Sequence, residues 1–124
     1  MRIVLDTNVY ISSIIFKGVC RELFLKTTEV DQCFISPFIL QKLSQKLTTK
    51  FLFSRELYIS FEVDLLKVIT LITPQTELPT VCRNIKDNNI LQLSESVNAE
   101  YLISGDNDLL VLKKYLNTLI LSPS

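Results

Sequence analysis

The sequence predicts an α/β protein in which a parallel sheet is covered by helices on both faces. Short apolar segments of the kind that form buried strands alternate with longer segments of helical periodicity. Such an alternation is typical of a parallel sheet that is buried on both faces. The chain has 124 residues, which suits one compact domain, and it contains no internal repeat and no recognisable domain boundary. We therefore expect residues 1–124 to form a single domain.

Local signals mark the first elements of the chain. Residues 2–5 are Arg-Ile-Val-Leu, a short run with three apolar and two β-branched side chains, which predicts a buried strand. The polar residues 6–8 (Asp-Thr-Asn) are suited to capping the helix that follows. Gly18 interrupts that helix, and a second amphipathic helix is expected from Val19 to about Thr28.

Two helices with apolar stripes are expected in the middle of the chain. After a short strand at 33–35, Ser36 is suited to capping a helix and Pro37 to its first position. Another helix runs from about Ser54 to Lys67. The apolar residues that recur at helical spacing are Leu40, Leu43 and Leu47 in the first helix and Leu57, Phe61 and Leu65 in the second.

The rest of the chain continues the alternation of strands and helices. The expected elements are a strand at 68–72, an irregular segment at 73–86, a helix opened by Asp87, strands at 101–103 and 118–121, and a short helix between these two strands. The strand at 101–103 is closed by a polar turn, Ser104-Gly105-Asp106.

Composition excludes several classes of protein. No apolar run approaches the ~18 residues of a transmembrane helix, and residues 1–5 do not resemble a signal peptide. Cys20, Cys33 and Cys82 lack the spacing of a metal or redox motif, which favours reduced thiols in a cytoplasmic protein. The chain has no histidine, so Ser-His-Asp and Cys-His nucleophiles are excluded and acidic oxygens remain as metal ligands. Its 13 basic and 13 acidic side chains cancel, so nucleic-acid binding would need a local basic patch.

Four aspartates are placed where an open α/β sheet collects ligands. Asp6 follows the first strand, Asp106 and Asp108 follow the fourth, and Asp87 heads the helix that leads into the fourth. Clustered carboxylates repel one another unless a cation binds, and Mg²⁺ and Mn²⁺ prefer oxygen ligands. Such a site lowers the pKa of a bound water and neutralises charge on a phosphodiester. For Asp87 and Asp106 taken singly, a simple role as helix N-cap stays open.

Three segments of the sequence resemble the motifs of the PIN-domain family, and the resemblance extends over nearly the full length. RIVLDTNVYIS at 2–12 is similar to the family opening, and CRNIKDNNILQLS at 82–94 is similar to the central motif. AEYLISGDNDLL at 99–110 is similar to the closing motif. Each motif alone is weak, but all three in this order and at these separations are specific.

The resemblance implies a three-layer α/β/α PIN-like fold with a central, mostly parallel five-stranded sheet. It also implies an endoribonuclease that depends on Mg²⁺ (or Mn²⁺) and resembles the toxins of VapBC-like toxin–antitoxin pairs. RNA would be its substrate, an antitoxin its partner, and a homodimer its frequent state. In that scheme Asp6, Asp87 and Asp106 hold the metal or orient the attacking water. The auxiliary residues would be Asn8, Ser104 and Asp108.

Two positions depart from the family pattern. The family normally has a glutamate about six residues past a Ser-Pro-like helix start, and that position is Lys42; position 84, often an acid, is Asn84. One interpretation is that Lys42 is a solvated residue on the flank of its helix. The other is that its ammonium points into the acidic cluster, offsets the carboxylate repulsion and weakens metal binding. The protein would then be a catalytically impaired PIN-fold protein that binds an antitoxin-like partner or RNA.

Two other magnesium-binding α/β folds fit the sequence less well. A phosphoacceptor receiver needs paired acids after its first strand and an aspartate at the end of its third, and residues 69–73 contain no acid. Phosphatases of the haloacid dehalogenase type need an acid two residues after the first aspartate, where this chain has Asn8.

Overall fold

The structure is a computed structural model that describes residues 1–16 and 18–123. The side chain of Cys20 lies outside the described part. The helices are α1 (Thr7–Ile15), α2 (Val19–Val30), α3 (Pro37–Thr49), α4 (Arg55–Val68), α5 (Ile85–Ser96) and α6 (Asn107–Leu110). The strands are β1 (Arg2–Leu5), β2 (Gln32–Ile35), β3 (Thr70–Leu71), β4 (Tyr101–Ile103), β5 (Lys114–Tyr115) and β6 (Thr118–Leu121).

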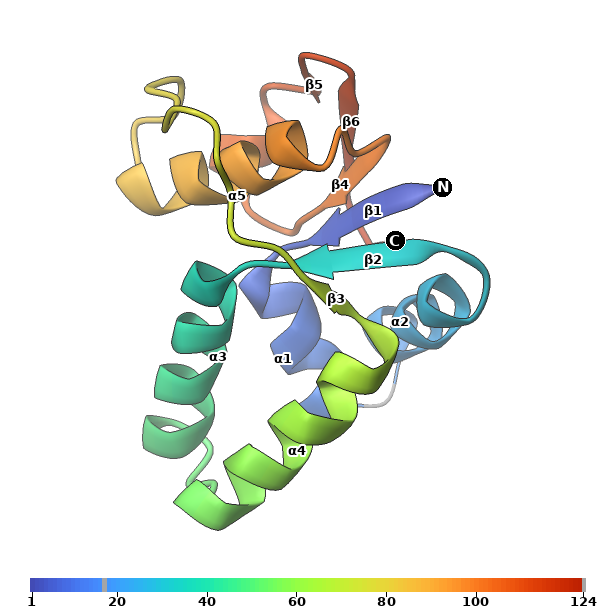
Figure 1. Ribbon diagram of the computed structural model, residues 1–124, viewed down its shortest axis with the longest axis vertical. Helices are drawn as coiled ribbons and strands as arrows, with labels where there is room; N and C mark the ends of the chain where they lie inside the picture. Colours follow the sequence, from blue (N-terminus) through green and yellow to red (C-terminus); the bar gives the residue numbers. More distant parts are fainter. Residues whose placement is uncertain (17, 124) are drawn as a thin grey trace.

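The strands form one mostly parallel sheet in the order β3-β2-β1-β4-β6-β5. Ile3, Val4 and Leu5 of the central strand β1 are all buried, although successive side chains of a strand point to opposite faces. Helices therefore cover both faces of the sheet, with α5 packed on β1 and α2 on β2. In Figure 1, α5 lies near β1 and α4 lies near β3, while α6 packs on β6. The predicted α/β/α fold with a central, mostly parallel sheet is confirmed.

The expected number of strands is wrong, because the sheet of the described residues has six strands rather than five. The extra strand is β5, which pairs antiparallel with β6 through Lys114 and Tyr115. A strand of two residues is too short for an apolar period to appear in the sequence. The turn that follows has the sequence Leu116-Asn117, so the Asn-Gly type of hairpin signal is absent, although Leu116 adopts the positive φ (52°) of such a turn.

Three element details also differ from the sequence-based expectation. Leu57 of α4 is 51% exposed, and Tyr58 is buried in its place and donates from its hydroxyl to the Leu40 carbonyl at 3.1 Å. Val68 belongs to α4, so β3 is shorter than the expected strand. Helix α5 begins at Ile85, two residues before Asp87. In each case the sequence pattern identified the element, and packing determined its boundaries or its buried face.

The carboxyl ends of β1 and β4 lie side by side and bring distant parts of the sequence together. The backbone N–H of Asp6 donates to the Ile103 carbonyl at 3.0 Å, which places Asp6 beside the turn that follows β4. Helix α5 packs on β1, so its first turn approaches the same edge of the sheet. Within residues 1–16 and 18–123, the helices are all too short or too polar to cross a membrane.

Candidate metal centre

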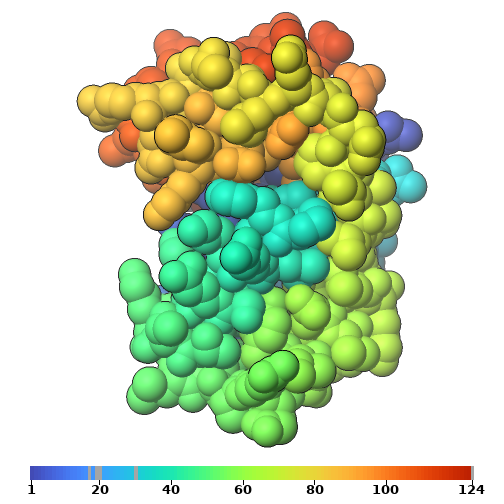
Figure 2. Space-filling view, turned by 60° about the vertical axis from the view of Figure 1, so that its left-hand side comes forward, coloured from blue at the N-terminus to red at the C-terminus, as the bar shows by residue number. Residues whose placement is uncertain are grey.

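A pocket of about 210 Å³ opens at the carboxyl ends of β1 and β4. Its walls come from the start of α1, from α3, from the first turns of α5 and from the residue that precedes α6. On the face shown in Figure 2, side chains of α3 lie directly against those of α5. The charged residues that line the pocket are Asp6, Asp87 and Asp106 together with Lys42, Lys46 and Lys86. The pocket therefore combines equal numbers of acidic and basic side chains.

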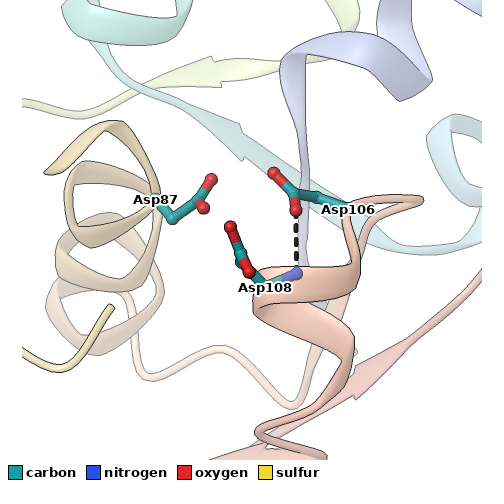
Figure 3. A group of neighbouring side chains, drawn as sticks. All are labelled: Asp87, Asp106 and Asp108. Carbon is teal, nitrogen blue, oxygen red and sulfur yellow. Dashed lines mark hydrogen bonds between the residues drawn. The ribbon is translucent and has the colours of Figure 1, made fainter. Parts of the chain in front are cut away.

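Three aspartates form a compact cluster on one side of this pocket. Asp87, Asp106 and Asp108 each offer one carboxylate oxygen, and these oxygens lie within 4.8 Å of one another. Figure 3 shows the Asp87 carboxylate on α5 facing Asp106 and Asp108 at the start of α6. Asp106 Oδ1 accepts a hydrogen bond from the Asp108 backbone N–H at 2.9 Å, so Asp106 also caps α6. Asp6 lines the same pocket but lies outside this group of three.

Asp87 has a buried oxygen without a partner. The residue is 4% exposed, and among the described residues its Oδ2 finds no hydrogen-bond donor. Burial is the main cause that raises the pKa of Asp87 from 3.8 to about 6, and the carboxylates of Asp106 and Asp6 raise it further. Asp87 occupies the third position of α5 rather than the cap, which is Asn84. The N-cap interpretation therefore does not apply to Asp87.

Asp6, in contrast, is well supplied with partners. It is 5% exposed, and its Oδ2 accepts a hydrogen bond from the Ser104 hydroxyl at 2.7 Å. Burial raises the pKa of Asp6, and the Ser104 hydroxyl, the Thr7 backbone N–H and the Lys46 ammonium oppose that rise. The Asp6 side chain makes no capping hydrogen bond to α1 within the described backbone. Its carboxylate is thus held toward the pocket rather than used to cap a helix.

Two lysines of α3 reach the pocket in different ways. Lys42 lines it, with its Nζ 5.7 Å from the centroid of the Phe38 ring. Lys46, one helical turn later, donates from Nζ to Asn8 Oδ1 at 2.9 Å. Partial burial lowers the pKa of Lys46, the Lys50 ammonium lowers it further, and the Asp6 carboxylate opposes the decrease. Lys42 was expected from the sequence as a candidate residue and Lys46 was not, although the spacing of four residues places both on one face of a helix.

A further basic residue contacts the acidic cluster from outside. Arg83 donates to Asp108 Oδ1 at 3.2 Å, and its side chain is 88% exposed. Arg83 was not expected from the sequence, because it lies in the irregular segment before α5 and no periodic pattern fixes the direction of its side chain.

The three carboxylates fit a hard divalent cation. Mg²⁺ and Mn²⁺ prefer oxygen ligands, and a cation at this cluster would satisfy the unpartnered Oδ2 of Asp87 and relieve the carboxylate repulsion. The chemistry of the donor set therefore agrees with the metal expected from the sequence motifs.

Comparison with known proteins bears on both the fold and the family. The chain resembles a chain in the crystal structure of VapBC2 from Rickettsia felis bound to a DNA fragment from their promoter. The match has a TM-score of 0.73 and 17% sequence identity, and it covers 98% of each chain, which supports the fold. Among curated proteins, none matches this sequence. A family model described as PIN domain matches residues 2–108. The chain belongs to the PIN-domain family.

Proposed function

We propose that the protein is a metal-dependent endoribonuclease of the PIN-domain toxin type, acting in the cytoplasm as a single domain of residues 1–124. The observation that carries this proposal is the buried, unpartnered Oδ2 of Asp87 next to the carboxylates of Asp106 and Asp108. A buried acceptor without a donor is costly, so its presence in a pocket indicates a cationic ligand. Membership of the PIN-domain family supports nuclease chemistry at this site.

The residues of the chain divide the work of hydrolysis between them. Asp87, Asp106 and Asp108 would hold Mg²⁺ or Mn²⁺, which supplies an activated water and neutralises charge on the phosphodiester. Asp6 lines the pocket and accepts a hydrogen bond from the Ser104 hydroxyl, and it would orient the attacking water. The lysines that line the pocket provide the local positive charge that the neutral chain as a whole lacks.

The partner proposed for the protein is an antitoxin, and its proposed state is a homodimer. The similar solved structure contains VapBC2 of Rickettsia felis on promoter DNA, and the likeness covers 98% of each chain. An antitoxin that inserts a segment near the acidic groove would control access of RNA to the pocket. Copurification of the chain with the product of a neighbouring reading frame tests this part of the proposal.

A second candidate function is favoured by the basic side chains of the pocket. Lys42 stands where the family normally has a glutamate, and it shares the pocket with Lys46 and Lys86. These ammonium groups weaken binding of a divalent cation through like-charge repulsion. On this alternative, the protein is catalytically impaired and acts by binding an antitoxin-like partner or RNA.

Isothermal titration with Mn²⁺ and Mg²⁺, followed by cleavage of a single-stranded RNA, separates the two candidates. Wild type should bind metal and cleave RNA, and Asp106→Asn should lose both properties. Asp64→Asn is the matched control, because the Asp64 side chain is 72% exposed and forms a surface ion pair with Lys67 on α4. Lys42→Glu should raise metal affinity and cleavage. Wild type that binds metal but cleaves no RNA, with cleavage appearing in Lys42→Glu, would favour the impaired form.

A further inference from the structure

The acidic pocket has two halves that differ in how their negative charge is compensated. In the first half, the Asp6 carboxylate accepts a hydrogen bond from the Ser104 hydroxyl at 2.7 Å. Two residues further on, Asn8 Oδ1 accepts a hydrogen bond from the Lys46 ammonium at 2.9 Å. The Lys46 charge is also one of the causes, after the Ser104 and Thr7 hydrogen bonds, that oppose the rise in the pKa of Asp6. This half therefore already contains a cation that is part of the chain.

In the second half, no lysine among the described residues forms an ion pair with Asp87, Asp106 or Asp108. Asp87 keeps a buried Oδ2 without a partner among the described residues, and its neighbours Asp106 and Asp108 are also acidic. The cation nearest to this group that forms an ion pair is Arg83, which contacts Asp108 from a side chain that is 88% exposed. Surface pairs of this kind compensate little charge. The demand for a bound cation is thus concentrated at Asp87, Asp106 and Asp108.

We propose that the pocket takes one divalent cation, at Asp87, Asp106 and Asp108, and that the Lys46 ammonium fills the place beside Asp6 where a second cation would otherwise bind. The inference rests on the proposed metal-dependent function and specifies its stoichiometry. Lys46 achieves this in two ways: its positive charge repels a second cation, and its hydrogen bond occupies the Asn8 oxygen that would serve as a ligand.

Lys46 fits this role better than Lys42 does. The ammonium of Lys42 lies 5.7 Å from the centroid of the Phe38 ring, against the wall of the pocket. Lys46 is one turn further along α3, at the level of Asn8, and it is the lysine that acts on the Asp6 carboxylate. The two lysines therefore make different predictions, and substitution of each one alone distinguishes them.

The test is the number of Mn²⁺ ions bound per chain, measured by isothermal titration calorimetry and by electron paramagnetic resonance. In the resonance spectrum, the electron spins of two neighbouring ions couple, whereas a single ion shows no such coupling. Wild type should bind one ion. Lys46→Met, which keeps the apolar stem and removes the charge, should bind two. Lys46→Arg and Lys42→Met should each bind one. In the double variant Lys46→Met, Asp6→Asn, the second ion should be lost again. Circular dichroism of each variant confirms that it is folded.

Each outcome supports or overturns the inference. Two coupled ions in wild type would overturn it and leave the proposed nuclease function standing. One ion in Lys46→Met would overturn it as well, because the lysine would then exclude nothing. Two ions in Lys42→Met but not in Lys46→Met would overturn the inference, because Lys42 would then be the lysine that excludes the second ion. No ion in wild type or in any variant would overturn the proposed metal-dependent function itself.

Discussion

Replacement of Asp87 by asparagine should make the metal-free protein more stable while removing its response to metal. Asp87 is 4% exposed, and burial together with Asp106 and Asp6 raises its pKa from 3.8 to about 6. A carboxyl whose pKa is higher in the folded state favours folding only while it is protonated. Stability of the metal-free protein should therefore fall as pH rises from about 4 to about 6, and should level off above pH 6.

The size of the effect follows from that change in pKa. A rise from 3.8 to about 6 corresponds to at most about 3 kcal/mol of destabilisation at neutral pH. The variant Asp87→Asn removes the buried charge and offers an amide N–H₂ that can donate to the Asp106 carboxylate. Burial of the amide itself has a cost, so we expect a net gain of about 1–2 kcal/mol at pH 7.5.

Urea unfolding followed by circular dichroism, with EDTA present, measures this gain. The advantage of Asp87→Asn over wild type should shrink as pH falls below 6 and should reverse near pH 4, where wild type no longer carries the buried charge and the cost of burying the amide remains. With saturating Mn²⁺ the order should reverse, because a ligand that binds only the folded state stabilises wild type alone. The exposed control Asp64→Asn should change stability by less than about 0.5 kcal/mol. A variant that is less stable than wild type at pH 7.5 without metal, or a difference that does not depend on pH, would refute the reasoning.

Three further substitutions test other contacts of the site and its support. Arg83→Ala should raise Mn²⁺ affinity by a few-fold in calorimetry, because it frees the Asp108 carboxylate from an exposed pair worth about 0–1 kcal/mol; weaker binding would contradict this. Ser104→Ala should reduce the free energy of unfolding by about 1–3 kcal/mol at pH 7.5, because it removes the hydroxyl that donates to the buried Asp6 at 2.7 Å. An NMR titration of the same variant should show a higher pKa for Asp6 than in wild type, and an unchanged pKa would count against this role of the hydroxyl. Leu43→Ala should cost about 2–5 kcal/mol in urea unfolding, since Leu43 is fully buried at 0% exposure; a loss below about 1 kcal/mol would mean that α3 packs loosely.

The sequence predicted most of the sheet because the central strands carry strong local signals. The strands at 2–5 and 118–121 have the predicted bounds, since they are short, apolar and buried at alternate or successive positions. The antiparallel β5 was missed because a strand of two residues is too short to show the alternation of apolar and polar residues that marks a strand. The buried face of α4 was also misjudged, because Leu57 and Tyr58 are both apolar enough to face inward and packing against α3 decided between them.

The acidic residues of the site were predictable for a topological reason. Asp6 and Asp106 follow strands that the parallel order places side by side, so their proximity follows from the fold. The role of Lys46 was not predictable in this way. The spacing of four residues shows that Phe38, Lys42 and Lys46 share one face of α3. Whether this face points into the pocket depends on how α3 packs on the rest of the protein, and the buried residues on the other face of the helix determine that packing.

On the proposed function, the charge of the pocket would allow a neutral chain to bind a phosphodiester. The three acids and three lysines that line the pocket cancel, as the 13 acidic and 13 basic side chains of the whole chain do. One divalent cation at Asp87, Asp106 and Asp108 would change this balance to a net positive charge at the mouth of the pocket. Affinity for the phosphate groups of RNA should therefore depend on bound metal. By linkage, bound RNA should increase the affinity for metal by the same factor, so that metal and substrate occupy the pocket together.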